Sequence, residues 1–195
     1  MRAMSIGLIV ISLLVNGCNQ KPKEAAVKET VVKDVAVIET KFGRIVFEFF
    51  PEVAPKHCES FKKLADSQFY DGVTFHRVIP GFMIQGGDPN SKDADRSNDG
   101  MGNPGFTLPA EFNDKPHLRG TVSMARTSNP NSAGSQFFIC VAPASYLDRQ
   151  YTVFGQVTEG LEVVDKIINV PRDPNDNPLE PVHMLKVRVM KSSEL

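Results

Sequence analysis

The stretch FHRVIPGFMIQGGD, residues 75–88, places a single arginine inside a run of aromatic and aliphatic residues that ends in two glycines. A structural arginine in such an apolar run needs an acidic partner, because burying an unpaired charge is costly. The run supplies no acidic residue before Asp88. Arg77 is therefore the first candidate functional residue, whereas the neighbouring His76 is interpreted as a hydrogen-bonded core residue. The paired glycines favour a tight turn at a strand end.

Outward from this stretch, short segments rich in β-branched and aromatic residues alternate with loops rich in Gly, Pro and Asn. They predict strands at 34–40, 44–50, 73–79, 82–86, 120–125, 136–142, 151–157 and 182–190. Residues 54–69 and 161–169 carry apolar side chains at helical spacing and predict two amphipathic helices. Many short strands with only two helices predict a mainly β fold, a closed β-barrel capped at its ends.

The chain has 195 residues and a formal net charge of -1, which gives no electrostatic reason to expect nucleic acid as a partner. After removal of a leader, this length suits one domain with a single core. Three cysteines are too few and too scattered for a disulfide framework or a zinc site. Cys58 and Cys140 are interpreted as small buried hydrophobic residues rather than as disulfide partners.

Residues 1–17 have the pattern of a signal peptide, with one positive charge followed by an apolar stretch too short for a comfortable membrane span. The Val-Asn-Gly-Cys that ends this segment resembles the lipobox of bacterial lipoproteins, although its first two residues depart from the commonest ones. The resemblance implies lipidation of Cys18 and a lipid-anchored, extracytoplasmic location in the cell envelope. An ordinary secreted protein is the alternative. Residues 18–33 then form a solvated, flexible tether, and residues 34–195 the folded domain.

Two motif matches lack the context that their chemistry requires. Residues 100–105, GMGNPG, fit a dinucleotide-binding glycine pattern but follow a polar segment instead of a buried strand. The segment from Asp95 begins like a calcium loop, but its twelfth position is Phe106 instead of a glutamate. The four histidines lack metal-ligand spacing. Because Ser135 also lacks the surroundings of a nucleophile elbow, the sequence predicts neither a metal site nor a hydrolase site.

Residues 75–88 resemble the central motif of the cyclophilin family of peptidyl-prolyl cis/trans isomerases over its whole length. GSQFFI (134–139) and YLDRQYTVFGQV (146–157) follow in the family order, and the resemblance extends over residues 34–191. It implies an eight-stranded antiparallel barrel with two capping helices. It also implies a rotamase that acts on X-Pro bonds of unfolded or exported polypeptides without a cofactor. A monomer is the default expectation.

The resemblance assigns roles to matching positions. Arg77 would stabilise the twisted amide, and Gln85 would hold Arg77 or the substrate carbonyl group. Ala125 and Gln136 would border the pocket for the residue before the proline, and the backbone at Arg126 would pair with the substrate chain. The apolar pocket for the proline ring would be lined by Phe82, Met83, Phe138 and Leu147.

Three positions depart from the family pattern. Tyr146 stands where many cyclophilins have tryptophan, Tyr151 where they have histidine, and Arg126 where asparagine is usual. Tyr151 can still stack on the substrate proline, so isomerase activity is expected to survive. Without the indole N–H, the chain is expected to bind the cyclic peptide cyclosporin weakly.

Two other functions compete with the isomerase. The first is a membrane-tethered chaperone or peptide-binding module whose turnover is incidental, but binding alone would not need Arg77. The second is a ligand-carrying, lipocalin-like barrel, which typically has G-x-W near its first strand. The chain contains no tryptophan, which disfavours this second alternative.

Overall fold

The computed structural model describes residues 32–195. The predicted signal peptide, Cys18 and residues 19–31 of the predicted tether lie outside this range, so the lipid anchor stays a prediction. Within residues 32–195, no helix has the length and apolar character that crossing a membrane requires.

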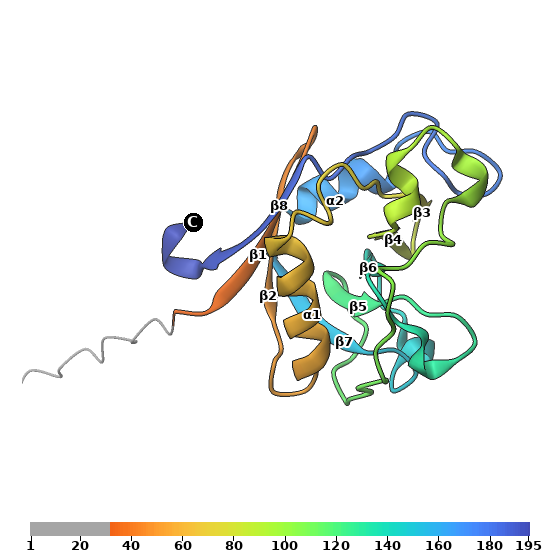
Figure 1. Cartoon of the computed structure of the whole chain (residues 1–195). Helices are drawn as coiled ribbons and strands as arrows, with labels where there is room; N and C mark the ends of the chain where they lie inside the picture. The colour runs from red at the N-terminus through yellow and green to blue at the C-terminus, as the bar shows by residue number, and fades with distance from the viewer. Residues whose placement is uncertain (1–31) are drawn as a thin grey trace, which may run out of the picture. The chain divides into compact units, whose positions relative to one another are not determined.

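The mainly β architecture and both helices are confirmed (Figure 1). Each strand and helix lies within a few residues of the segment predicted for it. The strands are β1 (Asp34–Thr40), β2 (Gly43–Phe49), β3 (Arg77–Ile79), β4 (Met83–Gly86), β5 (Thr121–Met124), β6 (Phe137–Cys140), β7 (Val153–Glu159) and β8 (Lys186–Lys191). The helices are α1 (Pro55–Asp66) and α2 (Leu161–Ile168).

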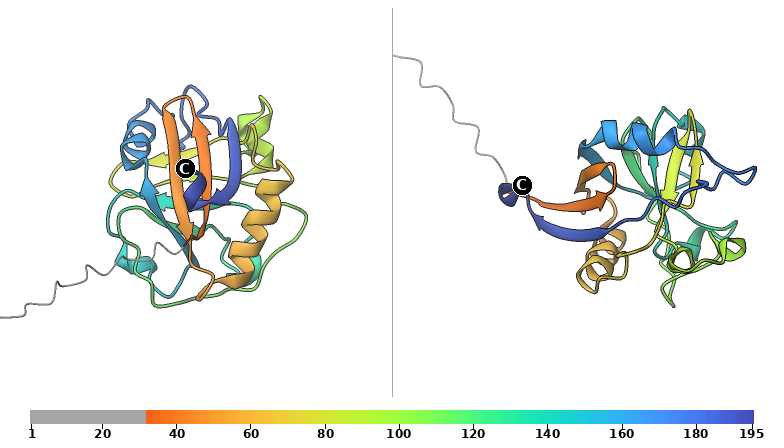
Figure 2. Two further views of the ribbon diagram at one scale, coloured as in Figure 1. Left: turned by 90° about the vertical axis from the view of Figure 1, so that its left-hand side faces the viewer. Right: turned by 90° about the horizontal axis from the view of Figure 1, so that it is seen from above.

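The eight strands form one antiparallel sheet in the order β3-β4-β6-β5-β7-β2-β1-β8. Figure 2 shows β1, β2 and β8 side by side on one side of the molecule. The predicted closure of the barrel is not confirmed, since β3 and β8 share no ladder in the described part of the chain. The segments that precede them meet at one isolated bridge, Thr74 with His183. Proline explains part of this gap, because the segment between α2 and β8 contains four residues without a donor N–H: Pro171, Pro174, Pro178 and Pro181.

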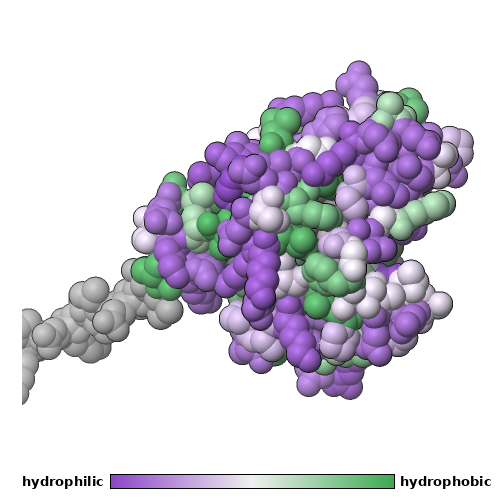
Figure 3. Space-filling view, in the orientation of Figure 1, coloured by the Kyte–Doolittle hydropathy of each residue, from purple (hydrophilic) through white to green (hydrophobic). Residues whose placement is uncertain are grey.

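The sheet separates two apolar clusters, and β6 contributes to both. Side chains alternate along a strand, so adjacent residues face opposite sides of the sheet. Phe137 packs in the main core, where its ring meets that of Phe61 edge-on at 5.5 Å between centroids. Phe138 packs in a second, smaller cluster with Met83 and Leu147. In Figure 3 hydrophilic residues cover most of the visible surface, and hydrophobic ones gather towards its middle.

The start of α1 is capped from a distant part of the sequence. Its N-cap residue, Ala54, has no side chain that could bond the free N–H groups of the first turn. The Glu111 carboxylate instead accepts hydrogen bonds from the backbone N–H groups of Lys56 and His57, at 3.2 and 3.1 Å. The His57 ring lies against the same carboxylate, with Nδ1 2.7 Å from the oxygen. Glu111 therefore ties a long loop to the helix.

The pKa shifts of this pair favour a neutral imidazole beside an ionised carboxylate. Burial lowers the pKa of His57 and outweighs the opposing influence of Glu111. Burial alone would raise the pKa of Glu111, but the hydrogen bonds from the His57 ring and from the two backbone N–H groups lower it overall. The two shifts agree with the short contact between His57 Nδ1 and Glu111, in which an N–H donates to a carboxylate oxygen.

Other buried polar groups confirm one prediction and correct another. Cys58 and Cys140 are free and buried, as predicted, and burial raises the pKa of these thiols to about 11 and about 12. His76 is buried, but the prediction of a hydrogen-bonded histidine is wrong. Neither of its ring nitrogens has a hydrogen-bond partner within the described residues. Burial lowers the pKa of His76 and outweighs the opposing influence of Asp88 and Asp99.

Candidate active site

A pocket of about 230 Å³ opens beside the second apolar cluster. Nine of the eleven side chains assigned to the site by resemblance form its lining: Arg77, Phe82, Met83, Gln85, Ala125, Arg126, Phe138, Leu147 and Tyr151. Of these, Met83, Phe138 and Leu147 are buried and form the apolar wall. The pocket is therefore apolar on one side and carries a guanidinium on the other.

Strand register explains how the residues meet. Arg77 lies directly opposite Gln85 in the β3–β4 pair, and Gln85 lies opposite Phe138 in the β4–β6 pair. Phe138 in turn lies opposite Ser123 of β5. Directly opposed residues of antiparallel strands lie on the same face of a sheet. The short strands therefore set the arginine, the amide and the aromatic ring in one row across the site.

The Arg77 side chain is exposed to solvent. None of the ion pairs formed within residues 32–195 includes it. Its guanidinium donors are thus available to a bound ligand, and no carboxylate neutralises its charge.

Gln85 does not hold Arg77 in this structure. Its amide Nε2 instead donates to Gln136 Oε1 at 3.0 Å, and Gln136 Nε2 donates to the carbonyl groups of Gly100 and Gly102, both at 2.9 Å. This amide chain borders a second pocket of about 250 Å³, which shares Gln85, Ala125 and Arg126 with the first. Gln136 belongs to this second pocket. The other predicted role of Gln85, contact with a substrate carbonyl group, stays a prediction.

The backbone between the two pockets is free to pair with an extended chain. Ala125 N–H donates to the Gln136 carbonyl group at 2.9 Å and ends the contact between these segments. The backbone N–H and C=O of Arg126 have no hydrogen-bond partner within residues 32–195. An unpaired edge of this kind binds peptides by strand addition.

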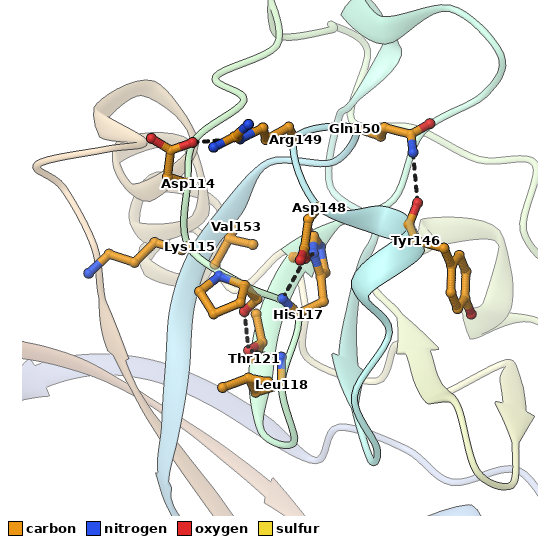
Figure 4. A network of polar contacts seen from close by, with 12 residues as sticks. Asp114, Lys115, His117, Leu118, Thr121, Tyr146, Asp148, Arg149, Gln150 and Val153 are labelled. Carbon is orange, nitrogen blue, oxygen red and sulfur yellow. Dashed lines mark hydrogen bonds and ion pairs between the residues drawn. The ribbon is translucent and has the colours of Figure 1, made fainter.

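A polar network that the sequence did not predict contacts Phe138 of the pocket through His117, and Figure 4 shows His117 with Asp148. The buried His117 ring contacts Asp148 through Nδ1 at 2.9 Å and Ser123 through Nε2 at 3.1 Å. It also lies parallel to the Phe138 ring, with 6.0 Å between centroids and 13° between planes. Hydrogen bonds from the His117 backbone N–H and ring lower the pKa of Asp148. A serine in the apolar run TVSM was the available signal, since a buried hydroxyl group needs a partner.

The two tyrosines that depart from the family pattern lie in different places. Tyr151 meets Phe138 edge-on at 5.8 Å and lines the first pocket. Tyr146 is 63% exposed and lies outside the lining, with its ring 5.8 Å from that of Phe82. Tyr146 is therefore a residue of the rim.

Within the described residues, no group of His, Cys, Asp and Glu side chains has the arrangement of a metal site. The calcium-like segment is a turn in which the Asp95 carboxylate accepts the backbone N–H of Ser97 at 3.0 Å.

These features define a peptide-binding protein of the cyclophilin class: a curled antiparallel sheet with two helices, an apolar pocket beside Arg77, and a backbone edge at Arg126 that can pair with a peptide. The family model described as "Cyclophilin type peptidyl-prolyl cis-trans isomerase/CLD" matches residues 35–189, and the chain belongs to this family. It is a peptidyl-prolyl cis-trans isomerase, as its relatives also indicate.

Relatives and solved structures agree with this assignment. The chain is 48% identical to a peptidyl-prolyl cis-trans isomerase of Synechococcus elongatus, over 70% of this chain and 90% of the relative. It is 46% identical to a probable peptidyl-prolyl cis-trans isomerase of Brucella abortus, over 69% of this chain and 71% of the relative. A cyclophilin-type isomerase of Cryptosporidium parvum, crystallised in the presence of the dipeptide Ala-Pro, is 32% identical with a TM-score of 0.73. That match covers 80% of this chain and 98% of the other.

Proposed function

We propose that Arg77 accelerates rotation about X-Pro bonds by stabilising the twisted amide. Resonance makes the planar amide resist rotation, with a barrier of about 18–20 kcal/mol. In the twisted transition state, the proline nitrogen loses conjugation and regains a basic lone pair. A guanidinium directed at that nitrogen stabilises the twisted form more than the planar one, and such differential binding raises the rate. The observation that carries this proposal is the unpaired Arg77 on the edge of an apolar pocket.

The remainder of the pocket must contribute as well. A 10⁵-fold acceleration needs about 7 kcal/mol, at about 1.36 kcal/mol per decade. A charge-assisted hydrogen bond contributes about 1.5–3 kcal/mol net. The difference is assigned to the apolar wall, which holds the proline ring, and to the free backbone at Arg126, which fixes the substrate chain. Gln85 would contact a substrate carbonyl group in the same complex.

The test is cis-to-trans isomerisation of a short Ala-Pro peptide by the purified protein and by Arg77→Ala. We expect kcat/KM to fall by about 10²–10³-fold, the effect of losing one preorganised donor. Arg44→Ala is the matched control, because Arg44 is an exposed arginine of β2 paired with Glu159, and its activity should equal that of the parent. If Arg77→Ala kept the parental rate, the arginine mechanism would be wrong.

We further propose that the enzyme acts on unfolded or exported proteins outside the cytoplasm, held at a membrane by lipid on Cys18. The support is the sequence alone: an apolar leader, a lipobox-like Val-Asn-Gly-Cys and a charged tether. More than one acyl chain makes such anchoring stable. Expression of the full chain in a bacterium with radiolabelled palmitate should label the parent but not Cys18→Ser. An unlabelled parent found free in the medium would favour the ordinary secreted protein.

A further inference from the structure

The Arg126 side chain reaches from the end of β5 to the turn that contains Gln150, 24 residues later in the chain. Its Nε and Nη2 atoms both donate to the backbone carbonyl group of Gln150, at 3.0 and 2.9 Å. Its Nη1 atom donates to the Thr127 carbonyl group at 2.8 Å. Three charge-assisted hydrogen bonds of this kind hold a planar guanidinium in one orientation.

The same guanidinium lies against the ring of Tyr151. The central carbon of the guanidinium is 4.4 Å from the centroid of the Tyr151 ring. The same carbon is 5.9 Å from the centroid of the Phe112 ring. A cation at this distance from an aromatic face is attracted by its quadrupole. The Tyr151 ring in turn meets the ring of Phe138, part of the apolar wall of the first pocket, edge-on. Arg126 thus backs one wall of the pocket that it also lines.

The carbonyl group that accepts from Arg126 belongs to a tight turn between two residues of the pocket lining, Leu147 and Tyr151. Gln150 donates its backbone N–H to the Leu147 carbonyl group at 3.0 Å and its side-chain Nε2 to the Tyr146 carbonyl group at 2.7 Å, the latter visible in Figure 4. The preceding residue, Arg149, has φ of 60°, a left-handed conformation that a non-glycine residue adopts only under restraint. Because Gln150 is itself bonded to Tyr146 and Leu147, the hydrogen bonds from Arg126 to its carbonyl group restrain the whole turn.

We propose that Arg126 is a positioning residue for the isomerisation reaction: it clamps the Tyr146–Tyr151 segment to the end of β5 and holds the Tyr151 ring against the proline site. This inference rests on the proposed function, because Tyr151 and Phe138 are taken as walls of the proline pocket. It also gives a physical reason for two departures from the family pattern at once. An asparagine side chain is too short to reach the turn, and a tyrosine offers the guanidinium an aromatic face.

A double-mutant cycle on the purified protein tests whether the arginine acts through the tyrosine. We expect Arg126→Ala to lower kcat/KM for the Ala-Pro peptide by about 10-fold, the loss of a cation–π contact and part of the hydrogen bonding. Tyr151→Leu keeps an apolar wall without the aromatic face and should lower it similarly. The double variant should be no slower than the slower single variant. Two losses that simply multiply would show independent action and overturn the clamp.

The matched control is Arg149→Ala. Arg149 is the adjacent arginine of the same turn, but its guanidinium points away and pairs with the exposed Asp114 at 2.7 Å. Its kcat/KM should stay within twofold of the parent. Arg126→Lys keeps the charge without the planar fork and should recover part of the activity that Arg126→Ala loses.

A second readout uses no substrate. The chain has only three tyrosines, so the Tyr151 ring can be followed by NMR in the free protein. In the parent, its ring protons should show contacts to Phe138 from one fixed rotamer, and these should weaken through rotamer averaging in Arg126→Ala but not in Arg149→Ala. A Tyr151 ring that stays fixed in Arg126→Ala would overturn the clamp. Because this measurement involves no catalysis, its outcome is independent of whether Arg77 performs the proposed chemistry.

Discussion

Replacing Glu111 with alanine should destabilise the fold by about 3 kcal/mol, although the residue lies outside the pocket. Among the described residues, 32–195, Glu111 supplies the side chain that caps α1, and a lost cap costs about 0.5–2 kcal/mol. The substitution also leaves the ring Nδ1 of His57 without its acceptor, and an unsatisfied buried group costs about 1–3 kcal/mol. For a domain of this size, about 3 kcal/mol corresponds to a fall in Tm of about 6–12 °C.

The assay is thermal and urea unfolding followed by circular dichroism. Glu111→Gln keeps one acceptor oxygen and should lose less than Glu111→Ala. Glu180→Ala is the control, because this glutamate forms a surface ion pair with Lys41 and its side chain is 89% exposed. A loss for Glu111→Ala no larger than that for Glu180→Ala would refute the capping role.

The effect of Glu111 should also depend on pH with a defined sign. Since the fold lowers the pKa of Glu111, its stabilisation is fully present above its ordinary value of 4.5 and is lost as the pH falls through the lowered value. The difference in unfolding free energy between the parent and Glu111→Ala should therefore narrow in strong acid. A difference that stays constant down to acid pH would contradict the reasoning.

Three further outcomes follow from particular residues. Burial lowers the pKa of His57 and His76 below 6.5, so below that pH the unfolded chain binds protons that the folded chain does not. The unfolding free energy should therefore fall from pH 6.5 downwards, by up to about 1.4 kcal/mol per pH unit for each histidine. His76→Asn should make this pH dependence less steep. Gly87→Ala should cost at least about 2 kcal/mol, because Gly87 has φ of 89° and an added Cβ would clash with the Ser135 carbonyl oxygen. Gly81→Ala should cost less, because Gly81 has φ of 75° but open space around the position of the Cβ. Tyr146→Trp should raise the affinity for cyclosporin in calorimetry by restoring an indole N–H, and an unchanged Kd would show that the donor is irrelevant.

The sequence predicted the fold well because its short apolar runs are bounded by clear turn residues. Strand existence follows from local pattern, and the register that joins Arg77, Gln85 and Phe138 follows once the β3–β4 turn is placed. Closure of the barrel was not predictable in this way. It depends on the pairing of two chain segments distant in sequence, and proline interrupts one of them.

The site was predictable where a residue matched a family motif, and unpredictable where its role depends on a long-range contact. His117 and Asp148 are 31 positions apart, and His57 and Glu111 are 54 apart, so no local pattern could join them. The side chain of Arg126 was missed for a related reason. Its backbone was assigned from the motif, but its guanidinium contacts a turn 24 residues away.

The pairing of β1 with β8 has a consequence for the order in which the chain can fold. Asp34, at the beginning of the domain, lies opposite Lys191, 157 residues later. A ribosome releases the chain from its N-terminus, so the first strand must wait for nearly the whole domain before its outer partner exists. Contacts of such high sequence separation slow folding, and an early hairpin of β1 and β2 would meanwhile present an unpaired edge to other chains. In this topology, folding of the N-terminal half before the C-terminal strand is available is therefore unproductive.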